Sequence, residues 1–257
     1  TKLETITLNT ETTAIAEGAF AGCSKLTTLN LAALTKLETI GEGAFVGAGL
    51  ETIDLSKASA EFVAINDYTF MDMPALTTVK LAPSIKTIGE AAFAFYGYDK
   101  NHKTKGGLAT IDGLNSATLE SIDDDAFFGA AITALDLSGA TNGKFITIPT
   151  GAFQYNSNLA TVKLPAQIEE IEYLAFADDI ALSSINLNQT SITELNNIFT
   201  TYVGGADPEI SLDKLTSLEL EKDASVTVDD KPLPDLEVVW DYALQFTGLQ
   251  KGEIPST

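Results

Sequence analysis

Two aspartates, Asp112 and Asp136, are the residues whose type and spacing come nearest to those of a catalytic pair. Each takes the same position in a short apolar pattern, so they would face the same way on neighbouring strands. Carboxylates about 5 Å apart raise one pKa or attract a cation, and retaining glycosidases use a similar separation. Because Leu114 arrives one residue late in its pattern, a bulge leaves the register of Asp112 open. We expect no catalytic residue, with hydrolysis or calcium binding at this pair kept as alternatives.

The other reactive side chains lack partners. Cys23 and His102 are the single Cys and the single His of the chain. They could form a nucleophile and its base, but they fall three repeats apart, or roughly 14 Å at the strand spacing. The run Asp123-Asp124-Asp125 is typical of a solvated turn, since calcium needs six to eight oxygens from a shaped loop. The sequence contains no phosphate loop, dinucleotide fingerprint or His-rich spacing, so we expect no metal and no cofactor.

The charge of the chain excludes one large class of partners. It has 36 acidic residues against 15 Lys and no Arg, for a net charge of −21. A protein of this charge lacks the cationic face that nucleic acids require. No apolar run approaches the roughly 18 residues that would span a membrane. The charge itself is explained by solubility of a long surface, and we expect a monomer.

A repeat organises the residues named so far. Its first signature is LxxIxL, which predicts a short strand with Leu and Ile pointing inward. Nine copies recur in steps of 23 to 33 residues, starting at Leu3, Leu26, Leu50, Leu76, Leu108, Ile132, Leu159, Leu182 and Leu215.

A second signature follows each strand: an Ile, then four residues, then a Phe that usually has Ala before it. The pairs are Ile15/Phe20, Ile40/Phe45, Ile65/Phe70, Ile88/Phe93, Ile122/Phe127, Ile148/Phe153 and Ile171/Phe176, with Leu195/Phe199 one residue short. Phe columns in phase with the strands indicate stacked coils, each of which buries its apolar set only against its neighbours.

The predicted fold is therefore a solenoid. We expect a right-handed coil with nine strands on one parallel β-sheet face, and with short helical or 3-10 turns that carry the Phe. Residues 1–220 form the repeats. Residues 221–257 depart from the pattern and are expected to cap the open end of the core, with Trp240, Tyr242 and Phe246 as the plug. A ligand platform at Trp240 is the alternative.

The segments LTTVKLAPSIKTIGEAAFAFY and LATVKLPAQIEEIEYLAFADD resemble the BspA-type, or Treponema pallidum-type, leucine-rich repeat. The resemblance covers about residues 3–220. It implies a secreted or surface-anchored bacterial protein, some members of whose family bind host matrix proteins or other cells. Because Thr1 opens inside a repeat unit, we expect an export signal upstream of it. The resemblance carries over no catalytic residue and identifies no ligand.

The outward positions of the strands offer one possible binding face. The third position of LxxIxL is mostly Thr, which suits exposed strands and cross-strand pairing. The fifth position varies in chemistry as a recognition surface would, and its charged members Asp54, Lys80, Asp112, Asp136 and Lys163 form the secondary candidate face.

The loops after the Phe offer the preferred site. The gap from Phe to the next strand is 5 or 6 residues except in two coils, where it is 15 and 16. Insertions at one point of a solenoid map to one face, often the binding face, although neutral loop drift would also produce them. We expect a protein partner at the edge built by residues 94–107 and 200–214. The candidate contacts are Tyr96, Tyr98, Lys100, His102, Lys103, Lys105 and Tyr202.

The function expected from these features is non-enzymatic interaction or adhesion with a protein partner at the cell surface. The lysines of the first loop would steer an acidic partner locally. A structural stalk of a larger surface protein is the alternative, followed by a glycan-binding or hydrolytic surface protein.

Overall fold

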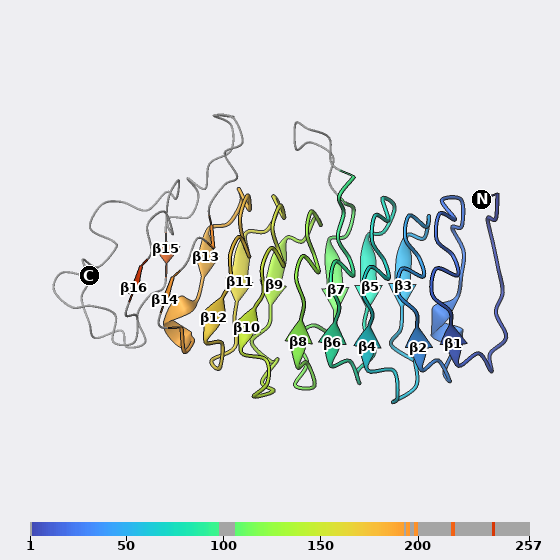
Figure 1. Ribbon diagram of the computed structural model, residues 1–257, viewed down its shortest axis with the longest axis horizontal. Helices are drawn as coiled ribbons and strands as arrows, with labels where there is room; N and C mark the ends of the chain where they lie inside the picture. Colours follow the sequence, from blue (N-terminus) through green and yellow to red (C-terminus); the bar gives the residue numbers. More distant parts are fainter. Residues whose placement is uncertain are drawn as a thin grey trace.

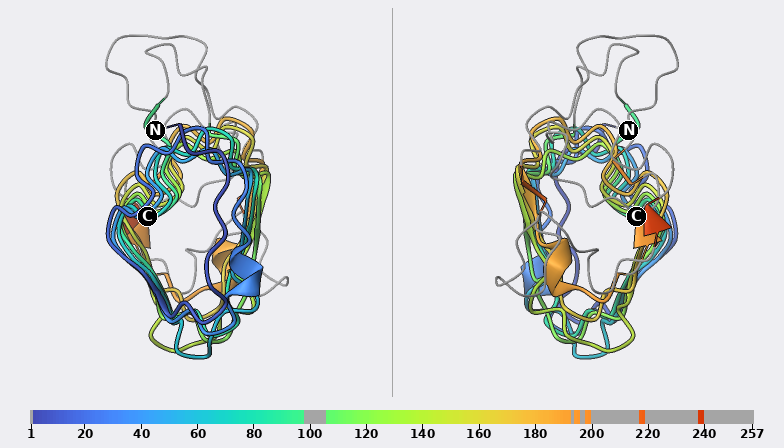
Figure 2. Two further views of the ribbon diagram at one scale, coloured as in Figure 1. Left: turned by 90° about the vertical axis from the view of Figure 1, so that its right-hand side faces the viewer. Right: turned by 90° about the vertical axis from the view of Figure 1, so that its left-hand side faces the viewer.

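Two rows of short parallel strands run along the solenoid, one on each side of its core (Figure 1). The computed structural model describes residues 2–97, 106–192, 194–195, 198–199, 217–218 and 238–239. Seen along the axis in Figure 2, successive coils superpose as one ring. The predicted solenoid of parallel strands is confirmed, and no helix in the described ranges is long and apolar enough to cross a membrane.

The first row contains the LxxIxL strands. Their register joins the third positions of the pattern, as in Thr52↔Thr78↔Thr110 and Ala134↔Thr161↔Ser184↔Ser217, and an isolated bridge joins Thr5 to Thr28. The strands are β3 (Thr52–Asp54), β5 (Thr78–Lys80), β7 (Thr110–Asp112), β9 (Ala134–Asp136), β11 (Thr161–Lys163), β13 (Ser184–Ile185) and β15 (Ser217–Leu218).

The second row contains the Ile of the second signature. One sheet face was expected, but these segments also pair in parallel, because stacking of the coils brings their backbones to hydrogen-bonding distance as well. Each row is divided into shorter sheets; β7 and β9, for example, belong to different ones. The strands are β1 (Ala14–Ile15), β2 (Thr39–Ile40), β4 (Ala64–Ile65), β6 (Thr87–Ile88), β8 (Ser121–Ile122), β10 (Thr147–Ile148), β12 (Glu170–Ile171), β14 (Glu194–Leu195) and β16 (Val238–Val239).

The Phe column forms the centre of the core. Seven rings from Phe20 to Phe176 stack in sequence, with centroids 5.1 to 5.5 Å apart and planes within 20° of parallel. Phe199 continues the column as a fully buried side chain. Leu and Ile of both strand rows surround these rings in one continuous cluster.

The turn that carries each Phe has a backbone unlike the 3-10 turn expected. Residues two before and two after the Phe take left-handed φ values between 48° and 67°, except at Phe95. Alternate N–H groups then point along the axis to the next coil, as Phe20 N does to Ala44 O at 2.7 Å, and back within the turn, as Cys23 N does to Phe20 O at 3.1 Å. The 3-10 helices of the described residues, η1 (Leu31–Ala33) and η2 (Leu187–Gln189), follow first-row strands instead.

The structure bears on two irregularities of the repeat, the late Leu114 and the C-terminal segment. The late Leu114 is accommodated by Gly113, whose φ of +104° lets Leu114 turn back into the core. At the C-terminal end, β16 pairs in parallel with β14, so the second strand row reaches into the segment expected to be a cap. Trp240, Tyr242 and Phe246 lie outside the described residues, and the boundary at residue 220 stays a prediction.

Candidate interaction surface

The Phe-bearing turns together form one long edge of the solenoid, which we call the turn edge. It is the upper edge in Figure 1. It consists of residues 16–23, 41–48, 66–73, 89–96, 123–130, 149–156 and 172–179. The first long loop leaves this edge after Gly97 and returns at Gly106, whose N–H donates to Gly129 O at 3.0 Å. The base of that loop is therefore tied to the next coil.

Tyr96 lies at the start of this loop and is the one member of the preferred site that falls within the described residues. Its column is packed inward in other coils, as at Cys23 and Ala48, but Tyr96 is turned outward and 38% exposed. The backbone N–H of Tyr96 donates to Asp72 Oδ1 at 2.7 Å, and its hydroxyl donates to Asp125 Oδ2 at 2.8 Å. Burial and the hydrogen bond to Asp125 raise the pKa of the Tyr96 phenol well above its ordinary value.

Around Tyr96 the turn edge carries an aromatic patch outside the main core. The ring of Tyr96 lies 4.8 Å from that of Phe128, and Phe128 meets Tyr155 edge-on at 5.1 Å. Tyr68 and Met71 pack at the other side of the patch, over Ala91 and Ala94. We define the aromatic patch as Tyr68, Met71, Tyr96, Phe128 and Tyr155.

A column of carboxylates runs beside the aromatic patch, and the sequence analysis missed it. The third residue before the Phe is acidic in five successive coils: Glu17, Glu42, Asp67, Glu90 and Asp124. Backbone bonds keep these residues in register, since each of the first four turns donates an N–H to the carbonyl of the next member, from Gly18 N to Glu42 O through Ala91 N to Asp124 O, at 2.8 to 3.0 Å. Counting back from each Phe would have found this carboxylate column.

The pKa values of the carboxyls are raised at the Asp123–Asp125 end of this surface. Desolvation raises the pKa of Asp124, with contributions from the charges of Glu172, Asp125 and Glu90. Desolvation likewise raises the pKa of Asp123, to which Asp67 and Asp124 add. Asp125 is half-buried beneath Tyr96 and has its pKa raised by burial as well. Asp123 and Asp124 are exposed, as expected for a solvated turn, and Asp125 is the member that is partly buried.

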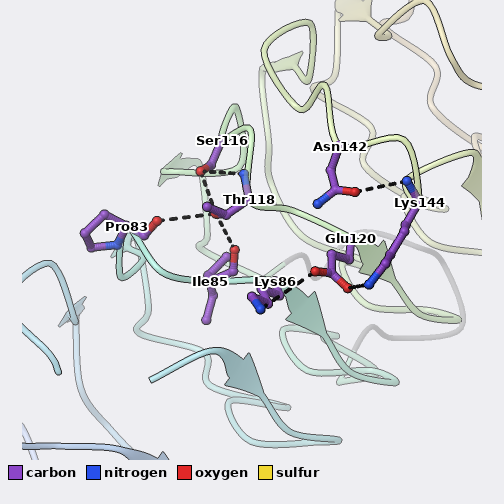
Figure 3. Close-up of polar contacts among 8 residues, drawn as sticks. All are labelled: Pro83, Ile85, Lys86, Ser116, Thr118, Glu120, Asn142 and Lys144. Carbon is purple, nitrogen blue, oxygen red and sulfur yellow. Dashed lines mark hydrogen bonds and ion pairs between the residues drawn. The ribbon is translucent and has the colours of Figure 1, made fainter. Parts of the chain in front are cut away.

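On the opposite edge one acid is paired with two lysines. There Glu120 lies between Lys144 and Lys86, at Oε2–Nζ and Oε1–Nζ distances of 2.7 and 3.9 Å (Figure 3). The hydrogen bond from Lys144 lowers the pKa of Glu120. Thr118 closes the neighbouring turn by donating to Ile85 O at 2.6 Å. The turn edge holds eleven acidic residues and no Lys, and within the described ranges no ion pair reaches it.

The secondary candidate face is a line of alternating charges. Lys80 is in register with Asp54 on one side and Asp112 on the other. Lys163 is in register with Asp136 and contacts it at 3.7 Å. The Ser56 and Ser138 hydroxyls, which donate to Asp54 and Asp136, are the largest causes that lower the pKa of these two carboxyls. This face is self-neutralised.

Asp112 and Asp136, the two aspartates that come nearest to a catalytic pair in the sequence, each align with a lysine. Asp112 aligns with Lys80 and Asp136 with Lys163, and their strands belong to separate sheets. Hydrogen bonds from Ser138 and the charge of Lys163 lower the pKa of Asp136. Cys23 is buried as a packing residue, and among the described residues no group of three or more His, Cys, Asp or Glu could hold a metal ion.

The remaining residues of the preferred site lie outside the described residues. They are Tyr98, Lys100, His102, Lys103, Lys105 and Tyr202. Their contribution to binding stays a prediction, and the geometry of the edge rests on Tyr96 and its neighbours.

Comparison with known proteins agrees with this architecture. The family model described as "BspA type Leucine rich repeat region" matches six copies, over residues 1–113 and 105–202. A leucine-rich repeat protein from Bacteroides ovatus ATCC 8483 has the same fold, at 18% identity and a TM-score of 0.53 over 96% of this chain. The chain spans 62% of the length of that protein.

Two further bacterial structures are similar at lower scores. A leucine rich cell surface protein from Faecalibacterium prausnitzii A2-165 has 18% identity and a TM-score of 0.36, over 98% of this chain and 72% of that one. A leucine-rich repeat protein from Eubacterium ventriosum ATCC 27560 has 14% identity and a TM-score of 0.40, over 99% and 78%. No protein of curated function matches the sequence.

Proposed function

The chain belongs to the BspA-type leucine-rich repeat family, and we propose that it is a non-enzymatic interaction or adhesion module that holds a protein partner along its turn edge. The resemblance stated for its repeats favours a place outside the cell. We infer the turn edge because the first long loop follows it in the sequence and starts in a built aromatic patch.

The observation that carries this proposal is Tyr96 with its surroundings. A neutral loop insertion would need no particular residue at its base. Tyr96 is instead fixed at its backbone by Asp72, at its hydroxyl by Asp125 and at its ring by Phe128. A rigid, partly exposed aromatic with a polar tip is the type of residue that anchors protein interfaces.

The strand face supports binding less well. Its charges alternate in sign along the row and Lys163 already contacts Asp136, so a partner would have to displace that contact. A stalk would need neither face. The turn edge is preferred because Tyr96 is partly exposed there and because, among the described residues, no ion pair reaches the carboxylate column.

The experiment that tests the proposal is binding of the full chain to an array of host and bacterial surface proteins. Deleting residues 97–105 then probes the edge, and it shortens the gap after Phe93 from 15 to 6 residues, the length found in other coils. We expect at least a ten-fold loss of affinity for the partner. The matched control changes the other face, Lys80→Gln with Lys163→Gln, and should retain binding.

Three results would contradict the proposal. Unchanged affinity after the deletion, with loss in the Lys80/Lys163 control, would move the site to the strand face. Turnover of a glycan or peptide that disappears with Asp112→Asn or Asp136→Asn would make the protein an enzyme. An array with no partner would leave the stalk as the function.

A further inference from the structure

We propose that Asp72 is a positioning residue of the turn edge: it holds the backbone of the next coil at the point where the first long loop begins, and so fixes Tyr96 in place. The role of this contact in binding a partner rests on the proposed function. The contact itself is a property of the free protein and can be measured without a partner.

The contacts of Asp72 are the first argument. Its N–H donates to Ala94 O at 2.8 Å, and its Oδ1 accepts the N–H of Tyr96 at 2.7 Å. Asp72 therefore holds the next coil at two points of one short segment. In an ordinary coil the N–H that corresponds to Tyr96 bonds within its own turn, as Ala48 N does to Phe45 O at 2.9 Å. The carboxylate replaces that bond with a charge-assisted one, which is stronger than a bond between neutral groups.

The backbone of Asp72 is the second argument. Its φ is +52°, in the left-handed region. The same place in three other turns belongs to Gly22, Gly47 and Gly129, with φ of 66° to 67°. Glycine adopts this conformation without the penalty that a Cβ imposes. Asp72 thus bears a conformational cost that Gly avoids, and its side chain supplies the hydrogen bond to Tyr96 that Gly could not make.

The packing of Phe95, between the two points that Asp72 holds, is the third argument. Its side chain is buried and lies against both ends of the described chain at the loop. A Cβ added at Gly97 would be 2.9 Å from Phe95 Cζ, and one added at Gly106 would be 2.9 Å from Phe95 Cβ. The segment that carries Tyr96 is therefore held from below as well as from the preceding coil. An anchor held in this way is preorganised, which reduces the entropy lost when a partner binds.

The sequence repeats the same combination at the second long gap. Asp follows the Phe by two residues in two coils, at Asp72 and Asp178, and each of these coils directly precedes a coil with a long gap. Tyr follows the Phe by three residues in two coils, at Tyr96 and Tyr202, and these are the coils with the long gaps. Tyr202 lies outside the described residues. A neutral insertion would require no particular residue in the coil before it, so this coincidence favours a positioning role for the aspartate.

The test compares Asp72→Gly with Asp72→Asn in the full chain. Gly removes the acceptor and relieves the left-handed backbone. Asn keeps an acceptor oxygen at the same place and tolerates that backbone, so it is the matched control. Two quantities are measured in the absence of any partner: the hydrogen exchange rate of the Tyr96 amide, by NMR, and the urea midpoint of the whole chain.

We expect the Tyr96 amide to exchange about ten-fold faster in Asp72→Gly and within about three-fold of the parent in Asp72→Asn, because local opening sets this rate. The urea midpoint of Asp72→Gly should stay close to that of the parent, since relief of the left-handed φ offsets the lost hydrogen bond. With a partner from the array, affinity should fall about five-fold in Asp72→Gly and stay within about two-fold in Asp72→Asn.

Two results would overturn the inference. An unchanged Tyr96 exchange rate in Asp72→Gly would show that Asp72 does not hold this backbone. Exchange that is equally faster at Phe45 and Phe153, with a lower urea midpoint, would show a general loss of stability instead of a local one. The proposed function fails separately. If the Tyr96 amide is released in Asp72→Gly and an array partner still binds as before, the contact stands and the partner lies elsewhere.

Discussion

Asp179 is a carboxyl group at a position where most other coils bury an apolar side chain. The same column contains Cys23, Ala48, Met73, Ala130 and Asn156. Asp179 Oδ1 accepts the backbone N–H of Asn156 at 2.7 Å, and the Asn156 amide donates in turn to Phe153 O at 2.6 Å and Phe127 O at 2.9 Å. Complete burial raises the pKa of the Asp179 carboxyl well above its ordinary value. The folded protein therefore favours its protonated form.

This raised pKa predicts the sign of a pH effect. Between the unfolded pKa, about 4, and the higher folded pKa, the folded state holds a proton that the unfolded state releases. Stability contributed by this group is present at low pH and is lost as pH rises through that window. Asp179→Asn removes the titration and keeps an acceptor for Asn156. We expect the free energy of unfolding of this variant, measured by urea denaturation, to increase relative to that of the parent as pH rises from 4 to 7.

Asp136→Asn is the control of opposite sign. Its folded pKa is lowered, chiefly by the Ser138 hydroxyl, so the stability it contributes is lost as pH falls. The free energy of unfolding of the Asp136→Asn variant should be lower than that of the parent at pH 7 and should approach it at low pH. A parallel pH dependence in both variants would show that burial of Asp179 is not the cause.

Phe153 tests the central column. It is fully buried between Phe127 and Phe176, at ring distances of 5.3 and 5.5 Å. Phe153→Ala should lower the free energy of unfolding by about 3–5 kcal/mol, because the neighbouring rings cannot collapse into the space. Tyr173→Ala, at a position 51% exposed, is the control and should change it little. Equal effects would mean that the stack contributes no more than surface packing.

At the scale of the element, the Phe-bearing turn is the part of the fold that sequence patterns described least well. The strands before and after the turn, and the Phe within it, were predictable because inward Leu, Ile and Phe recur at a fixed spacing along the repeat. Its left-handed residues were not, since Tyr68, Ala91 and Leu174 adopt φ of 48° to 59° where Gly would be expected. Hydrogen bonds from the next coil impose this backbone, so it depends on stacking that no single repeat encodes.

The candidate site shows the same division. The length of the first loop could be read from the sequence, where the chain departs from the repeat after Phe93. The partners of Tyr96 could not be predicted, because Asp72 and Asp125 come from the coils on either side of it. The alternating register of Lys80 and Lys163 with aspartates likewise required the pairing of strands.

Substitutions at two glycines distinguish the cost of left-handed backbone in the turn from the cost of a steric clash with the neighbouring coil. Gly47 and Gly129 both have φ of +66°, but a Cβ would meet nothing within 4 Å at Gly47 and would lie 2.4 Å from Phe95 O at Gly129. Gly47→Ala should cost roughly 1–2 kcal/mol, the penalty of left-handed backbone for a residue with a Cβ. Gly129→Ala should cost clearly more in the same urea titration. Equal costs would show that the turn yields freely to the added methyl group.

At the scale of the whole molecule, unbalanced charge opposes the compact state. The chain carries a net charge of −21, and the coils bring like charges to about 4.8 Å, well within the roughly 10 Å screening length at 0.1 M salt. Raising NaCl from 20 to 300 mM should therefore increase the urea midpoint. The increase should be smaller in a variant that combines Glu42→Gln, Glu90→Gln and Asp124→Asn than in a control that combines the exposed changes Glu38→Gln, Glu61→Gln and Glu169→Gln, because the carboxylate column places its acids on successive coils in backbone register. An equal increase in both would assign the effect to net charge alone.

The direction of the hydrogen bonds between coils has a mechanical consequence. These bonds lie along the long axis. A force that pulls the two ends apart is therefore parallel to them and breaks the bonds of one coil at a time. Each coil then unfolds separately, and the whole molecule does not unfold in one step. A coil such as Leu26 to Leu50, 24 residues, would release roughly 80 Å of chain. A protein held at one end and bound at the other would thus act as an extensible tether that lengthens in coil-sized steps under load.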